Sequence, residues 1–102
     1  METMQVDRIS ARDGFPLEVQ VSGPADAPAL LLLQGQSNSH EWWDDLRGDF
    51  EADFRTITFD YRGTGGSRGE LGELSTASFA DDAVDVLDHL GVDRAAVYGT
   101  CM

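Results

Sequence analysis

Cysteine is nearly absent from this sequence, because Cys101 is the only one in 102 residues. A single cysteine excludes a disulfide within the chain and fits a reducing compartment, so we expect a cytoplasmic protein. Long apolar runs are also missing. The longest, Ala29 to Leu33, is far shorter than the roughly 20 residues of a membrane helix. The first residues lack the basic start and apolar core of a secretory signal peptide.

Basic residues are scarce as well. The chain has 7 lysines and arginines against 19 acidic residues, a net charge of -12. That charge repels nucleic-acid phosphates and anionic lipids, so the composition argues against nucleic-acid and membrane partners. The 41% hydrophobic and 25% charged content is typical of a folded globular protein.

Alternating and continuous apolar patterns predict five strands. An opening antiparallel hairpin turns at Asp13-Gly14, and a strand that is apolar on both faces follows, as in a central parallel strand. The predicted strands are Gln5 to Ser10, Pro16 to Ser22, Ala29 to Leu33, Phe54 to Phe59 and Ala95 to Tyr98. Helical segments alternate with the later strands, which predicts an α/β fold with a mainly parallel sheet.

Two helical segments are predicted. Trp42, Trp43, Leu46 and Phe50 have helix-compatible spacings within the segment from His40 to Phe50. The clearest helix runs from Phe79 to about Leu90, with a capping-box-like start at Ser78 and Asp81 and a C-cap at Gly91. Its predicted apolar stripe comprises Ala80, Ala83, Val84, Leu87 and Leu90.

Three segments carry motifs that point to chemistry: Leu32 to Gln36, Phe59 to Ser67, and Val97 to Met102. In this order they resemble the α/β-hydrolase family over nearly the whole chain. The first is similar to a strand that ends in His-Gly-X, with Gln34 in place of histidine. The second is similar to the loop D-x-R-G-x-G-x-S, and the third to the nucleophile elbow G-x-S-x-G. Residues 1–102 therefore resemble the N-terminal portion of one α/β-hydrolase domain.

The resemblance assigns roles to several residues. Cys101 takes the nucleophile's place, where the family usually has serine, and a helix N-terminus there would favour the thiolate. The backbone N–H groups of Gln36 and Met102 would form the oxyanion hole. Ser37 and Trp42 are candidate substrate-binding residues beside it. Whether Cys101 is natural or replaces serine is left open.

The other candidate residues receive structural roles. Asp60 and Arg62 are expected to tie down their glycine-rich loop, and Asp60 is interpreted as an anchor, not as the triad acid. His40 and His89 are not assigned to catalysis. In this family the acid and the histidine follow the nucleophile in sequence, so the resemblance places both on a segment beyond these residues.

The resemblance predicts hydrolysis of small-molecule esters, thioesters or lactones through an acyl intermediate on Cys101, with no metal or organic cofactor. An acyltransferase on the same fold and a non-catalytic binding protein are the alternatives. Because a parallel sheet needs helices on both faces, we expect the fold to be incomplete alone, with Leu30 to Leu33 and the Trp42-Trp43 pair exposed. We also expect a second polypeptide to complete it, beginning near residue 103 after cleavage of the chain.

Overall fold

The computed structural model describes residues 4–34, 40–43, 46–63, 66–67 and 76–99, with the backbone alone described at Trp42 and Thr76. All five predicted strands are present, and their ends differ from the prediction by at most one residue. The elements are β1 (Gln5–Ser10), β2 (Pro16–Ser22), β3 (Ala29–Leu33), the 3-10 helix η1 (His40–Trp43), α1 (Arg47–Glu51), β4 (Arg55–Phe59), α2 (Thr76–His89) and β5 (Ala95–Gly99).

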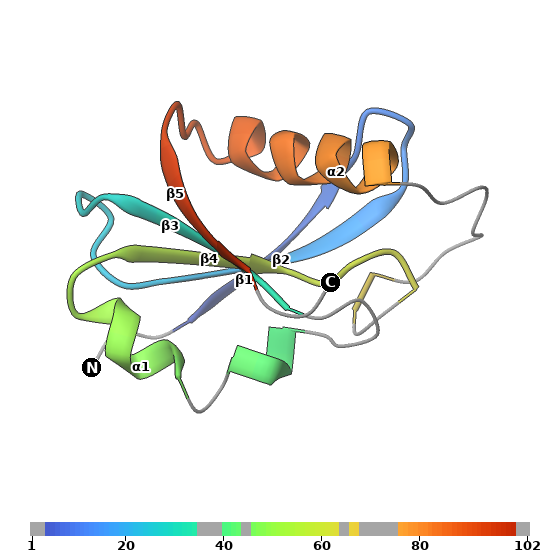
Figure 1. Cartoon of the computed structure of the whole chain (residues 1–102). Helices are drawn as coiled ribbons and strands as arrows, with labels where there is room; N and C mark the ends of the chain where they lie inside the picture. The colour runs from blue at the N-terminus through green and yellow to red at the C-terminus, as the bar shows by residue number, and fades with distance from the viewer. Residues whose placement is uncertain (1–3, 35–39, 44–45, 64–65, 68–75, 100–102) are drawn as a thin grey trace.

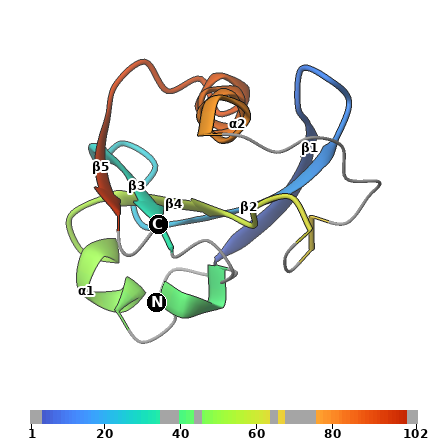
Figure 2. The ribbon, with the colours of Figure 1, turned by 45° about the vertical axis from the view of Figure 1, so that its right-hand side comes forward.

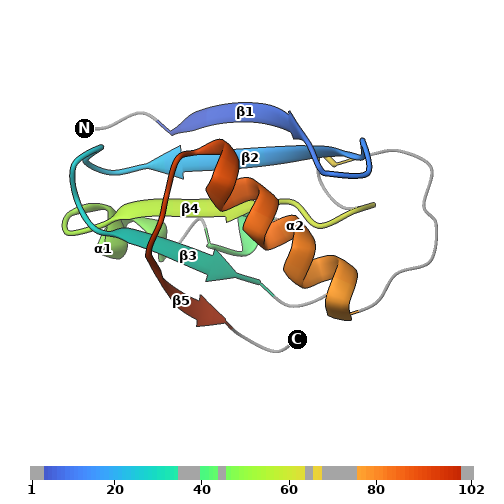
Figure 3. The same ribbon diagram turned by 90° about the horizontal axis from the view of Figure 1, so that it is seen from above.

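The described strands form one sheet in the order β1-β2-β4-β3-β5 (Figure 3). β1 pairs with β2 and β2 with β4 in antiparallel fashion, whereas β3 pairs in parallel with β4 on one side and with β5 on the other. The opening hairpin followed by a parallel part is the predicted α/β arrangement. β3 is therefore the strand on which the parallel part is built.

The two faces of the sheet are covered by different elements. α2 lies across one face, and η1 and α1 lie under the other (Figures 1 and 2). Side chains of β3 alternate between the two layers, as a pleated strand requires. Leu31 joins the core under α2, while Leu30 and Leu32 pack with Trp43 on the other face.

This coverage corrects one expectation from the sequence. Leu30, Leu31 and Leu32 are at most 6% exposed and Trp43 is fully buried, so the central strand is covered by elements of this chain. Two of the exposed large apolar side chains lie instead on β5, where Val97 is 60% and Tyr98 52% exposed. Within the described residues β5 is an edge strand with only β3 beside it.

The N-terminal half of α2 differs from the prediction. The helix begins at Thr76, so Ser78 and Asp81 lie inside it and the predicted capping box is wrong. The predicted stripe is also shifted, because Val86 is fully buried while Val84 is 48% exposed. The residues packed on the core are Phe79, Ala83, Val86, Leu87 and Leu90. They follow a helical period that leaves Val84 on the solvent side.

The C-terminal end of α2 agrees with the prediction. Gly91 adopts φ +70°, a left-handed conformation that glycine adopts without a Cβ penalty. Its N–H donates to the Asp88 carbonyl at 3.1 Å, and the Val92 N–H donates to the Leu87 carbonyl at 2.9 Å. These two bonds are those of a Schellman motif, which ends the helix and turns the chain toward β5.

The segment from His40 to Phe50 forms η1 and α1 instead of one continuous helical run, and Leu46 between them is 47% exposed. The sheet beneath α1 contains a polar cluster around Arg47, which is only 4% exposed. Its guanidinium donates to the Ser22 hydroxyl at 2.6 Å and to the Thr58 hydroxyl at 2.7 Å. The arginine thus docks α1 on the sheet through hydrogen bonds as well as apolar contacts. Among the described residues, no helix is long and apolar enough to cross a membrane.

Candidate active site

Three parallel strands end at one edge of the sheet, and the predicted site residues follow them. Gln34 comes directly after β3 and Asp60 directly after β4, while β5 ends at Gly99, in register with Leu33. From β3 the chain reaches β4 through η1 and α1 on one face, and from β4 it reaches β5 through α2 on the other face. Ligands in open α/β sheets bind where successive connections change faces in this way.

Gln34 is fully buried and is held to the end of β4 at two points. Its side-chain Nε2 donates to the Phe59 carbonyl at 2.9 Å, and its own carbonyl accepts a hydrogen bond from the Tyr61 hydroxyl at 2.8 Å. Its side-chain Oε1 has no hydrogen-bond partner among the described residues. The amide therefore supplies the donor that fixes the end of β3 where the resembling family has histidine.

Asp60 is fully buried and anchors two loops through its carboxylate. Oδ1 accepts from the backbone N–H of His40 at 2.7 Å and lies 2.7 Å from the His40 ring Nδ1, while Oδ2 accepts from the Gly66 N–H at 2.9 Å. Burial raises the pKa of the Asp60 carboxyl, but the hydrogen bonds from Gly66 and His40 outweigh it and hold the pKa below its ordinary range. This is the anchoring role predicted for Asp60.

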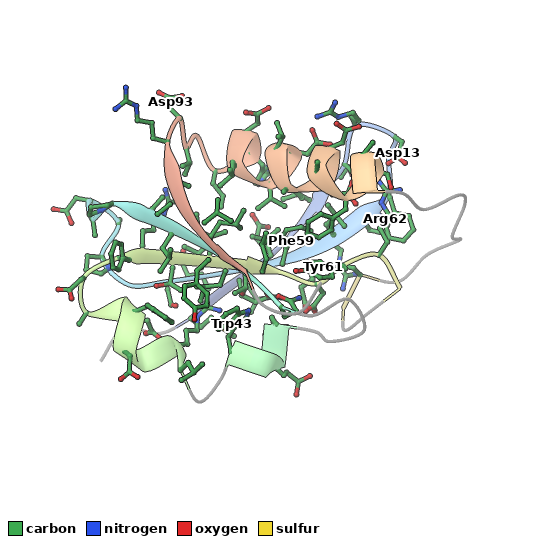
Figure 4. The ribbon with its side chains drawn as sticks, viewed as in Figure 1. Asp13, Trp43, Phe59, Tyr61, Arg62 and Asp93 are labelled. Carbon is green, nitrogen blue, oxygen red and sulfur yellow. The ribbon has the colours of Figure 1, made fainter. Side chains whose placement is uncertain are left out.

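Arg62 ties the same loop to α2 and to the β1–β2 hairpin (Figure 4). Its Nε and Nη2 donate to the two oxygens of Asp82 at 2.6 and 2.7 Å, and its Nη1 and Nη2 donate to the two oxygens of Asp13 at 2.7 and 2.9 Å. The guanidinium also lies 4.6 Å from the centre of the Phe15 ring. Such bidentate pairs fix orientation as well as distance, which confirms the predicted tie.

The glycine-rich loop closes on itself beside β2. Gly63 has φ +83° and its N–H donates to the Ser67 carbonyl at 2.8 Å. The Ser67 hydroxyl accepts from the Glu18 N–H at 2.8 Å. A positive φ at this position requires glycine or a strained residue, so the predicted left-handed turn is present at Gly63.

One group of residues has the donor types that hold metal ions. Glu18, His40 and Asp60 each offer one ligand atom, and the three atoms lie within 4.8 Å of one another. The Asp60 carboxylate already accepts two backbone hydrogen bonds and lies 2.7 Å from the His40 ring Nδ1, which occupies most of its roughly four lone-pair sites. The arrangement thus serves first as an anchor that pairs His40 with Asp60.

The residues predicted to carry the chemistry lie outside the described part of the chain. Cys101, Met102, Gln36 and Ser37 are all outside it, and of Trp42 only the backbone is described. Their roles remain predictions. The structure describes the strand ends from which these residues follow.

Sequence reasoning missed the contribution of Tyr61. It occupies the variable position of the motif, between Asp60 and Arg62, and its hydroxyl binds the Gln34 carbonyl. A tyrosine at a variable position carries no signal of a partner 27 residues away. The pairing of His40 with Asp60 was missed as well, although Asp60 belongs to one motif and His40 follows another by four residues.

Comparison with known proteins agrees with this geometry. Residues 28–102 match the model of the α/β hydrolase fold family. The chain belongs to that family. The α/β-hydrolase fold that the motifs predicted is thus confirmed.

The relatives of this α/β-hydrolase chain are much longer than the chain itself. It is 30% identical over 94 residues to 3-oxoadipate enol-lactonase 1 of Acinetobacter baylyi, covering 92% of this chain and 35% of that protein. It is similar in structure to naproxen esterase from Bacillus subtilis, with a TM-score of 0.84, 30% identity and coverage of 96% of this chain and 34% of the esterase. A hydrolase from Pseudomonas aeruginosa gives a TM-score of 0.88 at 28% identity, with coverage of 93% of this chain and 36% of that hydrolase. The chain thus spans about a third of their length.

Proposed function

We propose that the protein containing this chain hydrolyses small esters, thioesters or lactones through an acyl intermediate on Cys101. The thiolate attacks the carbonyl carbon, an S–C bond forms, and the N–H groups of Gln36 and Met102 stabilise the oxyanion. The alcohol or thiol then leaves with a proton from a histidine. Water attacks the thioester in turn, releasing the acid and restoring the thiol.

The observation that carries this proposal is the register of β3 with β5. Leu33 is paired with Gly99, so the segments leading to Gln36 and to Cys101 leave neighbouring strands at the same level. Gln36 is two residues past Gln34, and Cys101 two residues past Gly99. The register supports the proposal because the two segments that carry the nucleophile and the oxyanion donor begin side by side on paired strands.

The substrate class is supported by the chemistry in the relatives' names. One is an enol-lactonase, which names a lactone, and another is an esterase. Both names refer to carbonyl compounds with an oxygen leaving group, the substrates that a nucleophile beside an oxyanion hole attacks. A reducing, cytoplasmic compartment belongs to the same proposal, since a catalytic thiol must stay unoxidised.

We propose in addition that a further segment of the same protein, present as a second polypeptide, supplies the triad histidine and acid. Two observations support a complementing segment: the relatives are about three times as long as this chain, and Val97 and Tyr98 on β5 are exposed. Intact mass under denaturing conditions tests the division. Two species are expected, one near 11.1 kDa, and a single longer chain would contradict it.

Substitution of Cys101 in the intact protein tests the nucleophile. With an aryl ester, an acyl thioester and a small lactone as substrates, Cys101→Ala is expected to abolish turnover, whereas Cys101→Ser retains an attacking group. Denaturation during turnover should trap a wild-type protein heavier by one acyl group. An active Ala variant, or acylation elsewhere, would contradict the assignment.

Two variants of Gln36 form a matched pair for the oxyanion hole. Gln36→Ala keeps the backbone N–H and is expected to cost little. Gln36→Pro removes it and is expected to lower kcat by about 10²–10³-fold, the effect of losing one oxyanion donor. Equal losses in the two variants would point to a side-chain role instead.

A further inference from the structure

We infer that Tyr61 is a positioning residue for the oxyanion hole, acting through the carbonyl of Gln34. This inference rests on the proposed function, because it concerns where the N–H of Gln36 points. The Tyr61 hydroxyl donates to the Gln34 carbonyl at 2.8 Å, and the tyrosine is only 7% exposed. It reaches the end of β3 from the loop that follows β4.

The contact acts on the geometry of the chain because peptide units are rigid. The Gln34 carbonyl belongs to the same plane as the N–H of residue 35, so a donor that fixes the carbonyl fixes that plane. Only the two dihedral angles of Gly35 separate it from the next peptide unit, which carries the Gln36 N–H. Glycine has the widest conformational range of any residue, so residue 35 itself restricts the next peptide unit little. Fixing the plane of the Gln34 carbonyl removes a further source of freedom and so limits the directions available to the Gln36 N–H.

A second hydrogen bond attaches Gln34 to the β4 side of the sheet at another point. Its Nε2 donates to the Phe59 carbonyl at 2.9 Å, so residue 34 is held both through its side chain and through its backbone. Phe59 and Tyr61 flank Asp60, whose carboxylate binds the N–H of His40 just beyond the loop. Both described ends of the segment from Gln34 to His40 are thus fixed to the same stretch of β4 and its loop.

The tyrosine ring is itself held in place. It meets the Phe79 ring edge-on at a centroid distance of 4.7 Å and the Phe59 ring at 5.2 Å. Phe79 lies on α2 and Phe59 on β4, so Tyr61 is packed between the helix and the sheet, as Figure 4 shows for Phe59 and Tyr61. Burial raises the pKa of the Tyr61 hydroxyl, which keeps the hydroxyl protonated as a donor at neutral pH.

Tyr61→Phe tests the inference with one atom changed. The ring and its packing remain, and only the hydrogen bond to Gln34 is lost. We expect kcat toward an aryl ester to fall about 10-fold, less than the 10²–10³-fold that removal of an oxyanion donor costs, with KM within two-fold of wild type. A loss in kcat alone is the signature of an interaction made in the transition state.

Tyr98→Phe is the matched control, since Tyr98 is the only other tyrosine. It lies on β5, is 52% exposed, and meets Trp43 and Phe50 through its ring. The kcat of the Tyr98→Phe variant is expected to stay within two-fold of wild type. An equal loss in both variants would overturn the inference.

An aldehyde analogue of the substrate gives a readout that a purely structural role would not move. The thiol adds across its C=O bond, an S–C bond forms, and the oxygen occupies the oxyanion hole. Tyr61→Phe is expected to weaken this inhibitor about 10-fold, in parallel with kcat, and to leave binding of an unreactive amide analogue unchanged. Unchanged aldehyde affinity, or equal weakening of both analogues, would overturn the inference.

If Tyr61→Phe fails to fold, Gln34→Met tests the other half of the anchor. Methionine keeps the length and removes the bond to the Phe59 carbonyl, and the same loss in kcat with an unchanged KM is expected. A Gln34→Met protein with wild-type kcat would then overturn the inference. A wild-type protein without hydrolytic activity would contradict the proposed function and the inference with it. An active wild type with an equally active Tyr61→Phe overturns the inference alone.

Discussion

β3 and β5 lie side by side in one sheet and are both apolar in sequence, yet they are covered very differently. Leu32 on β3 is fully buried, while Val97 on β5 is 60% exposed. β3 has a parallel neighbour on each side and a covered surface on both faces, whereas β5, within the described residues, has one neighbour. Within the described residues, the strand that precedes Gln36 is therefore covered on both faces, while the strand that precedes Cys101 is exposed.

Truncation of one apolar side chain on each strand measures this difference directly. Leu32→Ala is expected to lower the free energy of unfolding by about 3–4 kcal/mol, because it leaves a cavity in a packed core. Val97→Ala removes one carbon atom fewer and is expected to cost less, and less than half as much if no further segment covers β5 in the intact protein. Urea denaturation of the intact protein gives both values. A larger loss for Val97→Ala would reverse the comparison.

A charge placed on β5 shows whether a further segment covers it. If the proposed complementing segment packs on this strand, Val97→Asp buries a carboxylate and is expected to cost about 2–3 kcal/mol in the intact protein. Val84→Asp is the matched control, because Val84 is 48% exposed on the outer side of α2, and should cost about 0.5 kcal/mol or less. Equally small losses, read from thermal unfolding, would mean that β5 is a free edge.

A smaller difference in stability is expected between the loop after β4 and the start of β5. Arg62→Ala is expected to cost about 2 kcal/mol, because it leaves the buried Asp82 carboxylate without its bidentate partner. Arg94→Ala, close to the start of β5, is expected to change the free energy by about 0.5 kcal/mol or less, since Arg94 is exposed. Denaturant midpoints at neutral pH measure both. Equal losses for Arg62→Ala and Arg94→Ala would mean that the Arg62 ion pairs do not anchor the loop after β4.

The smallest expected effect is a pH dependence at Asp13. The hydrogen bonds from Arg62, followed by the backbone N–H of Phe15, lower the pKa of its carboxyl from 3.8 to about 2. A carboxyl whose pKa is lowered in the folded state stabilises the fold at pH values above its unfolded-state pKa. That contribution is lost as the pH falls through the folded-state pKa. The difference in Tm between wild type and Asp13→Asn should therefore be full above about pH 4 and shrink toward pH 2.

Asp93→Asn is the control for that titration, because Asp93 precedes β5 and belongs to none of the ion pairs of the described residues. Its difference in Tm from wild type is measured over the same pH range. A difference that shrinks equally for Asp93→Asn would show that the Arg62 contact has no effect of its own.

The strands were predictable because their signals are local. Alternation in β2, the continuous apolar run of β3 and the positive φ required at Gly91 each follow from a few neighbouring residues. The extent of α2 was harder to predict, since Val84 and Val86 are equally apolar and only the position of the sheet decides which one is buried. Coverage of β3 was predicted wrongly because it depends on which helices fold back on it.

The site was predictable to the extent that it follows a motif. Asp60 and Arg62 were recognised as anchors, but their partners were not, because contacts such as Arg62 with Asp82 or Tyr61 with Gln34 join residues 20 to 27 positions apart. A motif fixes residue types along the chain and leaves the partner across the fold unspecified. The roles of Cys101, Gln36, Met102, Ser37 and Trp42 stay predictions for the experiments above.

The central place of β3 also sets an order of assembly during synthesis. Its partner Ile57 on β4 follows Leu31 by 26 residues, whereas Val97 on β5 follows by 66. Closing the longer loop costs about 0.8 kcal/mol more in chain entropy. β3 can therefore pair with β4 first. The other edge of β3 stays unpaired until α2 and β5 have emerged from the ribosome. An unpaired, leucine-rich edge is a template for aggregation, so the nascent chain is most prone to aggregate just before β5 is made.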